Sequence, residues 1–132
     1  MENRPNGEKN TITLRKAIKW TARWRKLKAC LNPQERCRAF NIPKIDLQEV
    51  LQEEGVASVR AYMGLQEQID EHGNLKFIEK LVIVGVDAEG KDMLPVDESN
   101  NNAFLFEEDG YVYDFTAPCP DVCDDQSPLN GF

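Results

Sequence analysis

Four cysteines are the residues whose type and spacing most directly suggest chemistry in this chain. Cys119 and Cys123 are separated by three residues, whereas Cys30 and Cys37 are separated by six. Four thiolates could bind zinc, but a gap of six exceeds the roughly two to four residues between most paired zinc ligands. We expect free thiols packed as small apolar groups, with a disulfide or a metal contact at Cys119 and Cys123 as alternatives. The sequence predicts no cofactor.

Acidic side chains of the C-terminal part form a second group. They could attract a basic protein. Asp121, Asp124 and Asp125 could also hold a divalent cation weakly, and for these three we favour a solvated acidic tail. The candidate partner-binding residues are Glu107, Glu108, Asp109, Asp121, Asp124 and Asp125.

Catalytic side chains form no recognisable set. His72 is the only histidine and follows a polar stretch next to Gly73. The chain has no Gly-x-Ser-x-Gly motif, and its glycines match neither the dinucleotide-binding pattern nor the Walker pattern. The sequence therefore favours a protein that is not an enzyme.

Charge is divided unevenly along the chain, whose net charge is −7 over 132 residues. Residues 1–66 hold 13 Lys and Arg against 7 Asp and Glu, and residues 67–132 hold 3 against 16. Such a division indicates either a partner of opposite charge or two halves that face each other in the fold. We favour the second interpretation, because most surface charge serves solubility.

An amphipathic helix is predicted from Leu14 onward, with Thr13 as its N-cap. Trp20 and Trp24 lie in its apolar arc, which predicts that both pack against a sheet. The opposite arc is cationic and could bind nucleic-acid phosphates or an anionic membrane surface, although the acidity of the whole chain counts against nucleic acid. The cationic arc consists of Arg15, Lys16, Lys19, Arg23 and Lys26.

Two more helices are expected. Asn32, which precedes a proline, favours the start of a short helix that continues to about Phe40. A third helix opens at Ile45, with Asp46 as its cap, and ends at Gly55.

Strands are predicted in the second half. Alternating apolar and polar residues indicate a strand over 57–65, and a β-branched run indicates a central strand within 76–86. The segment 92–96 contains a proline and is therefore expected at an edge. A last hairpin is predicted to join 104–106 to 111–115.

The domain organisation follows from composition and length. Residues 1–10 are expected to form a flexible leader, and 11–132 a single domain with an irregular tail from residue 116. Because no apolar run could span a bilayer and no signal-peptide pattern opens the chain, we expect a cytoplasmic protein. The predicted fold class is α+β, with N-terminal helices packed on one face of a mainly antiparallel sheet of three to five strands.

Several short motifs occur in an order that resembles a known group. They are Val59–Gly64, Leu81–Asp92, Tyr113–Phe115, Pro118–Pro120 and Cys123. From residue 45 to residue 123 the chain resembles small uncharacterised bacterial proteins with a Tyr-Asp-Phe-x-x-Pro-Cys-Pro-x-x-x-Cys-like tail. The resemblance implies that the tail belongs to the folded domain, and it implies no activity, cofactor or partner.

Three functions stay open at this point. The one we favour is a non-catalytic interaction module that presents its acidic C-terminal half to a basic protein partner. The first alternative is nucleic-acid binding through the basic helix. The second is a metal or redox role for the four cysteines.

Overall fold

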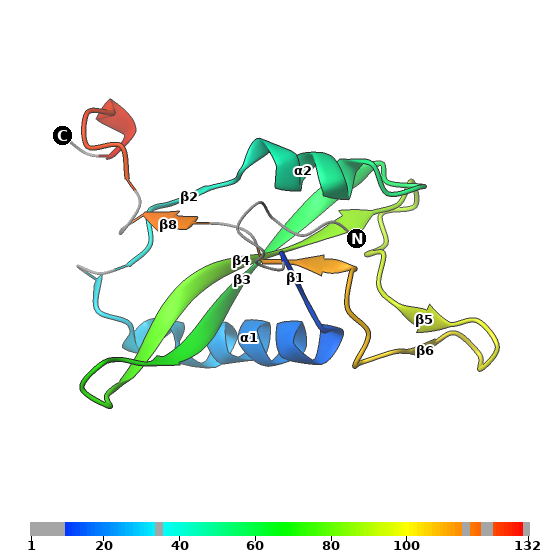
Figure 1. Cartoon of the computed structure of the whole chain (residues 1–132), viewed down its shortest axis with the longest axis horizontal. Coiled ribbons are helices and arrows are strands. Elements are labelled where there is room, and N and C mark those ends of the chain that lie inside the picture. Colours follow the sequence, from blue (N-terminus) through cyan, green and yellow to red (C-terminus); the bar gives the residue numbers. More distant parts are fainter. Residues whose placement is uncertain (1–9, 34–35, 115–116, 120–122, 131–132) are drawn as a thin grey trace.

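A four-stranded antiparallel sheet in the order β1-β7-β4-β3 occupies the centre of the molecule (Figure 1). The computed structural model describes residues 10–33, 36–114, 117–119 and 123–130, with the backbone alone for 117–119 and 130. The strands of the sheet are β1 (Thr11–Ile12), β3 (Ser58–Ile69), β4 (Leu75–Val86) and β7 (Val112–Tyr113). The fold is α+β, as the sequence predicts.

Two helices cover opposite faces of this sheet. Helix α1 (Leu14–Leu27) lies below it in Figure 1, and helix α2 (Lys44–Leu51) lies above it. Val82 and Val84 of β4 share one core cluster with Trp20, whereas Ile83 shares a second cluster with Val50. The prediction that the helices share one face is therefore wrong. Alternate side chains of β4 are buried on alternate faces, which requires a cover on both sides.

Helix α1 begins as the sequence predicts. The Thr13 hydroxyl oxygen accepts a hydrogen bond from the Lys16 backbone N–H at 3.2 Å. Trp20 is 6% exposed and lies against β3 at Gly64. Trp24 is only half-buried, which differs from the expectation for both tryptophans. Among the described helices, none is long and apolar enough to cross a membrane.

The predicted short helix does not continue to Phe40, because residues 36–38 are not helical and the chain is extended from Ala39 onward. At its expected start Pro33 lies in a 3₁₀ conformation, and residues 34–35 are outside the described residues. A 3₁₀ turn (Lys28–Cys30) follows α1, and the chain then forms β2 (Ala39–Asn41). Strand β2 pairs antiparallel with β8 (Ala117–Cys119), a segment of the tail. Pairing with a distant strand thus prevails over the local helix signal, because propensity is a weak prior against tertiary contacts.

The predicted last hairpin is also wrong in its pairing. Strand β6 (Ala103–Phe104) pairs with β5 (Val96–Asp97) in a small separate hairpin, while β7 joins β1 and β4. The chain therefore leaves the sheet after β4, forms the β5–β6 hairpin and returns. A short 3₁₀ turn (Pro128–Asn130) follows near the C-terminus.

The polar residue Asn10 belongs to the folded part of the chain. It is 1% exposed, and its side-chain amide donates to Asp46 at 3.1 Å and to Glu49 at 2.6 Å. Asn10 is therefore part of the folded domain, and residues 1–9 of the predicted leader lie outside the described residues. Asp46 lies in the first turn of α2 and faces Asn10, and Pro43 occupies the cap position where Asp46 was expected.

Candidate functional site

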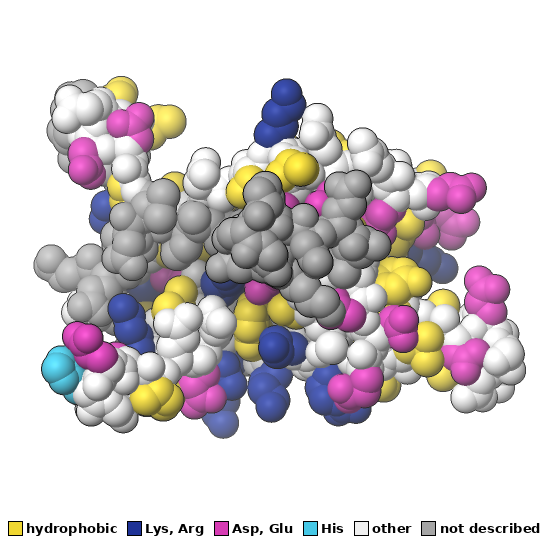
Figure 2. Space-filling view, viewed as in Figure 1, with side chains coloured by type: hydrophobic (Ala, Val, Ile, Leu, Met, Phe, Trp, Pro, Cys, Tyr) yellow, Lys and Arg dark blue, Asp and Glu magenta, His cyan; other side chains and the backbone are white. Residues whose placement is uncertain are grey.

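The β5–β6 hairpin carries an exposed group of apolar side chains. Val96 pairs with Phe104 across the strands, and the rings of Phe104 and Phe106 meet edge to face with centroids 6.2 Å apart. Phe104 is 52% exposed and Phe106 is 40% exposed. Figure 2 shows apolar and acidic side chains together at this end of the molecule. Exposed apolar groups rimmed by polar residues are typical of protein-binding surfaces.

Two carboxylates continue this group directly. Glu107 forms an ion pair with Arg15, whose guanidinium also lies over the Phe106 ring at 5.4 Å from its centroid. Glu108 is exposed beside it. We call Val96, Phe104, Phe106, Glu107 and Glu108 the aromatic–acidic surface. It combines rings that can be buried with charge that selects a basic partner.

Backbone contacts hold the hairpin in place against α1. The Arg15 N–H donates to the Phe106 carbonyl at 2.8 Å, and the Leu105 N–H donates to the Pro95 carbonyl at 2.9 Å. The turn between β5 and β6 contains Asn101 and Asn102, both with positive φ, a conformation that asparagine tolerates better than most residues. The aromatic–acidic surface is therefore linked to α1 by the backbone bond between Arg15 and Phe106.

The six predicted acidic residues do not form one surface among the described residues. Asp109 accepts a hydrogen bond from the Thr11 hydroxyl, so it joins the end of the sheet near β1. Asp124 and Asp125 are exposed close to the C-terminal 3₁₀ turn, at the opposite end of the molecule from β6 in Figure 1. Asp121 lies outside the described residues. The aromatic–acidic surface therefore contains two of the predicted residues, Glu107 and Glu108.

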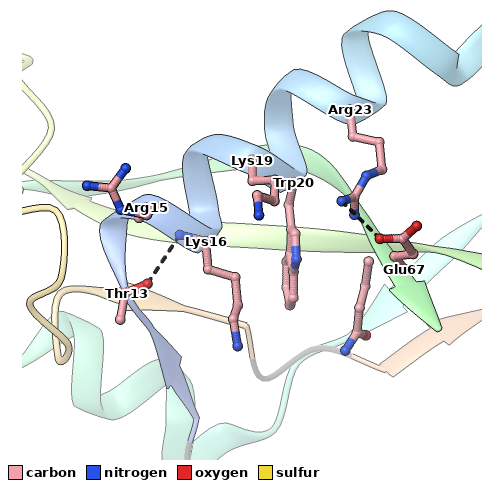
Figure 3. Close-up of a pocket in the computed structure, with 8 residues that line it drawn as sticks. Thr13, Arg15, Lys16, Lys19, Trp20, Arg23 and Glu67 are labelled. Carbon is pink, nitrogen blue, oxygen red and sulfur yellow. Dashed lines mark hydrogen bonds and ion pairs between the residues drawn. The ribbon is translucent and has the colours of Figure 1, made fainter.

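A second candidate site is a concave region between α1 and β3, which we call the basic groove. Its volume is about 370 Å³, and Figure 3 shows cationic side chains extending from α1 along it. Four of the five residues of the predicted cationic arc line it, and Lys26 does not. The groove is lined by Thr13, Arg15, Lys16, Lys19, Trp20, Arg23, Gln66 and Glu67.

Arg23 closes the groove at the β3 side. Its guanidinium donates to the Leu65 carbonyl at 2.9 Å and forms an ion pair with Glu67 at 3.5 Å. It also lies 6.0 Å from the centre of the Phe77 ring. Since Leu65 belongs to an edge strand, Arg23 satisfies a carbonyl of that edge as well as contributing charge.

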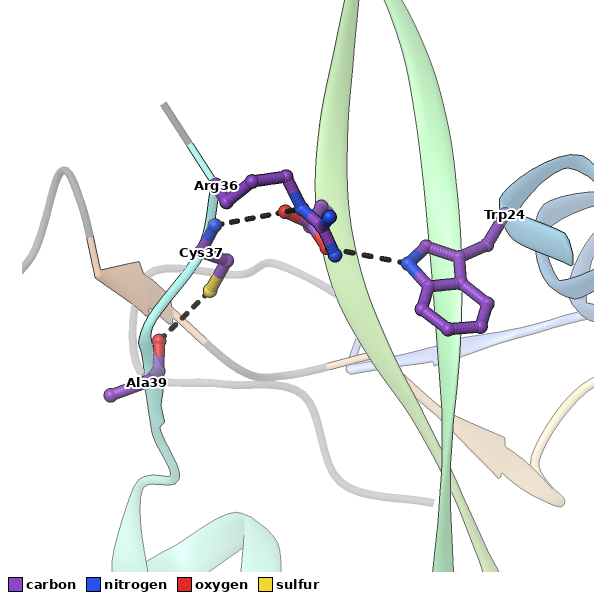
Figure 4. Close-up of polar contacts among 5 residues, drawn as sticks. Trp24, Arg36, Cys37 and Ala39 are labelled. Atoms are coloured by element: carbon purple, nitrogen blue, oxygen red, sulfur yellow. Dashed lines mark hydrogen bonds and ion pairs between the residues drawn. The ribbon is translucent and has the colours of Figure 1, made fainter. Parts of the chain in front are cut away.

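A buried carboxylate that the sequence analysis missed lies on β4. Glu79 accepts hydrogen bonds from the Trp24 indole at 3.3 Å, from Arg36 at 3.0 Å and from the Cys37 N–H at 2.8 Å. Figure 4 shows Trp24, Arg36 and Cys37 converging on this strand. Burial acts to raise the pKa of Glu79, but these donors outweigh it and the pKa lies below its ordinary value. The carboxylate is therefore a charged structural link.

An apolar cavity of about 170 Å³ lies on the other flank of α1, where Ile18 and Leu94 contribute to its lining. Tyr62 and Asp92 also line it, and the Asp92 carboxylate accepts hydrogen bonds from Tyr62 and Arg60. The bond to Asp92 raises the pKa of Tyr62 above its ordinary value. The tyrosine hydroxyl therefore stays protonated at neutral pH, where it acts as a hydrogen-bond donor rather than as a base.

The cysteines are divided between thiols and a disulfide. Cys30 and Cys37 are thiols outside any disulfide, and the Cys37 thiol donates to the Ala39 carbonyl at 3.1 Å. Cys123 is in a disulfide, and its sulfur lies 3.9 Å from a nitrogen of the Arg38 guanidinium. The expectation of free thiols is therefore wrong for Cys123. The side chain of Cys119 lies outside those described, so the alternative of a Cys119–Cys123 disulfide stays a prediction in its pairing. Within the described part of the chain, no group of three or more His, Cys, Asp or Glu side chains could hold a metal ion.

Comparison with protein families, with curated proteins and with solved structures finds no match for this chain. The resemblance to small bacterial proteins therefore stays a prediction. Any function must be argued from the surfaces themselves.

Proposed function

We propose that this chain is a non-catalytic protein-interaction module whose aromatic–acidic surface binds a basic segment of another protein. The observation that carries the proposal is the pair of contacting rings, Phe104 and Phe106, held half-exposed next to Glu107 and Glu108. Burying the exposed ring area would contribute on the order of 1–3 kcal/mol to binding. The carboxylates would speed the encounter and select for positive charge.

The chemistry of the surface defines the partner. Arg15 already neutralises Glu107 in part, so the exposed carboxylate of Glu108 supplies most of the remaining negative charge of this surface. A fitting partner carries Lys or Arg next to an apolar or aromatic side chain, which would pack on the exposed rings. The proposed location is the cytoplasm, which the reduced state of Cys30 and Cys37 favours and the disulfide at Cys123 counts against.

A comparative pull-down tests the proposal. The full chain is immobilised and exposed to lysate of the source cells, alongside the double variant Phe104→Ser, Phe106→Ser. We expect the wild type to retain a protein that the variant loses, and that protein to bind about tenfold or more weakly in 300 mM than in 50 mM NaCl. Isothermal titration with the purified partner gives both affinities.

A matched control comes from the far end of the β3–β4 hairpin. Ile69 and Leu75 pair with each other and are 66% and 53% exposed. The variant Ile69→Ser, Leu75→Ser removes a comparable apolar area from another surface and should bind the partner as the wild type does. The proposal is contradicted if the Phe104 and Phe106 variant retains the partner as well as the wild type does. It is also contradicted if both double variants lose the partner to the same extent.

A further inference from the structure

The basic groove is concave and is lined mainly by one sign of charge. Arg15, Lys16, Lys19 and Arg23 contribute four cationic side chains, and Glu67 is the one carboxylate of the lining. Clefts lined by one sign of charge focus the electrostatic potential and raise the local concentration of counter-ions. The volume of about 370 Å³ lies within the range of small-ligand sites.

Two of these charges have no partner among the residues that the structure describes. Arg15 pairs with Glu107, and Arg23 pairs with Glu67. The ammonium groups of Lys16 and Lys19 are exposed, and neither makes an ion pair or a side-chain hydrogen bond with any described residue. The positive charge of these two lysines is therefore available to a ligand.

The other groups of the groove limit what it can recognise. Trp20 is 6% exposed, so its ring face is not open for a base to stack on. The Lys16 N–H already bonds to Thr13 and the Arg15 N–H to Phe106, so the first turn of α1 offers neither amide to an anion. Recognition therefore depends on cationic side chains, with the hydroxyl of Thr13 and the amide of Gln66 as neutral groups nearby.

We propose that the basic groove binds a small ligand that carries two or more phosphate groups, with Lys16 and Lys19 as its main contacts. Arg23 is a positioning residue, because its bonds to Leu65 and Glu67 fix the wall of the groove. A compact oligophosphate suits this site better than a nucleic acid. The cationic strip is confined to one flank of α1, and the acidic half of the chain repels a long polyanion.

Isothermal titration with inorganic tripolyphosphate at pH 7 and 50 mM NaCl tests the proposal. The variant Lys16→Gln, Lys19→Gln should bind about tenfold or more weakly than the wild type, because it removes two charge-assisted contacts. The control Arg25→Gln, Lys26→Gln makes the same change in net charge on the same helix but outside the groove. It should stay within about twofold of the wild type, since only long-range charge changes.

Circular dichroism of each variant verifies that the fold is retained, as expected for substitutions at exposed positions. Equal weakening in both variants would show that tripolyphosphate responds to net charge alone, and would overturn the proposal. No weakening in the Lys16 and Lys19 variant would overturn it too. A third contrary result is binding of duplex DNA, RNA or anionic phosphatidylserine vesicles that tripolyphosphate cannot displace. None of these outcomes depends on the aromatic–acidic surface.

Discussion

Glu79 shows how a buried charge can connect three segments that are distant in the sequence. Its side chain is 7% exposed, and its three donors come from α1 and from the segment before β2. Charge-assisted hydrogen bonds are stronger than neutral ones, which explains why the carboxylate stays ionised despite burial. The sequence contains no local sign of this link, because the partners lie 42 to 55 residues away.

Replacing the Glu79 carboxylate should therefore lower the free energy of unfolding by an amount that depends on pH. We expect Glu79→Gln to lower the free energy of unfolding by about 1–3 kcal/mol at pH 7. The pKa of Glu79 is lowered in the folded state, so the ionised group stabilises above the unfolded-state pKa and loses this effect as the pH falls through the folded pKa. The difference in the free energy of unfolding between variant and wild type should thus stay constant from pH 7 to about pH 5 and narrow below that pH.

Urea unfolding at several pH values measures this narrowing. The control Glu89→Gln changes a carboxylate that is 77% exposed and should alter stability by less than about 0.5 kcal/mol at every pH. If the loss of stability caused by Glu79→Gln is the same at every pH, the contacts of Glu79 stabilise the fold through packing and not through the charge of the carboxylate.

Single residues of the candidate sites were predictable to different degrees. Helical spacing identifies the cations of the basic groove, because an exposed helix face follows directly from a period of 3.6. The same spacing includes Lys26, which the groove excludes, since only contact with β3 decides where the groove ends. The sequence predicts a hairpin strand over 104–106 that joins 111–115, whereas Phe104 alone of the two rings lies in a strand, and that strand pairs with β5 instead of the central sheet.

Strand β4 accounts for both the success and the error of the fold prediction. Its run of apolar residues correctly indicates a central strand, and an unbroken run also indicates burial on both faces. A single covered face was expected for this central strand, so α2 was expected on the same face as α1, whereas burial on both faces requires a helix on each side. The helix predicted up to Phe40 is wrong over 39–41 for a different reason. The strand that pairs with this segment, β8, lies in a tail without strand-like alternation.

The contact of α1 with β3 depends on the absence of a side chain at Gly64. A Cβ atom there would lie 3.2 Å from the Trp20 Cβ and 3.2 Å from the Val82 Cγ2. Both distances are shorter than ordinary van der Waals contact, and both neighbours are buried. Gly64 thus allows the helix to approach the sheet closely.

We expect Gly64→Val to lower the free energy of unfolding by about 1–3 kcal/mol, because overpacking pushes α1 away from β3. Tryptophan emission should shift to longer wavelength as Trp20 meets water. Urea unfolding followed by fluorescence records both effects. The control Gln68→Val lies on the same strand at an exposed position. It should leave the urea midpoint of unfolding and the wavelength of tryptophan emission nearly unchanged. Identical midpoints for the two variants would refute the close contact.

At the scale of the whole molecule, the two oppositely charged halves of the sequence meet in the fold. Among the described residues, ion pairs that join residues 1–66 to residues 67–132 include Arg15–Glu107, Arg23–Glu67, Arg36–Glu79 and Arg60–Asp92. Each exposed pair contributes little stability, about 0–1 kcal/mol. Their main effect is on the surface, because pairing lowers the charge that Arg15 and Glu107 can offer to a partner, whereas Lys16, Lys19 and Glu108 are exposed without an ion pair to a described residue.

The proposed interaction surface lies on a weakly held part of the molecule, and this has a measurable consequence. Strand β4 is bonded on both sides and buried on both faces, whereas β5 and β6 pair only with each other over two residues. Local opening costs least where few apolar contacts and few paired amides must be broken. Hydrogen exchange measured by mass spectrometry should therefore give the slowest amides in Val82–Val86 and fast exchange in Ala103–Phe106.

A bound partner should change this pattern at one place. If it packs on Phe104 and Phe106, the amides of Ala103–Phe106 should slow while those of β4, already protected, change little. Adding tripolyphosphate instead should slow exchange near the groove without altering the hairpin. If the hairpin amides of the free protein exchange as slowly as those of β4, the hairpin is not the less stable of the two segments and this prediction is wrong. Partner-induced protection confined to other segments would show that the aromatic–acidic surface is not where binding occurs.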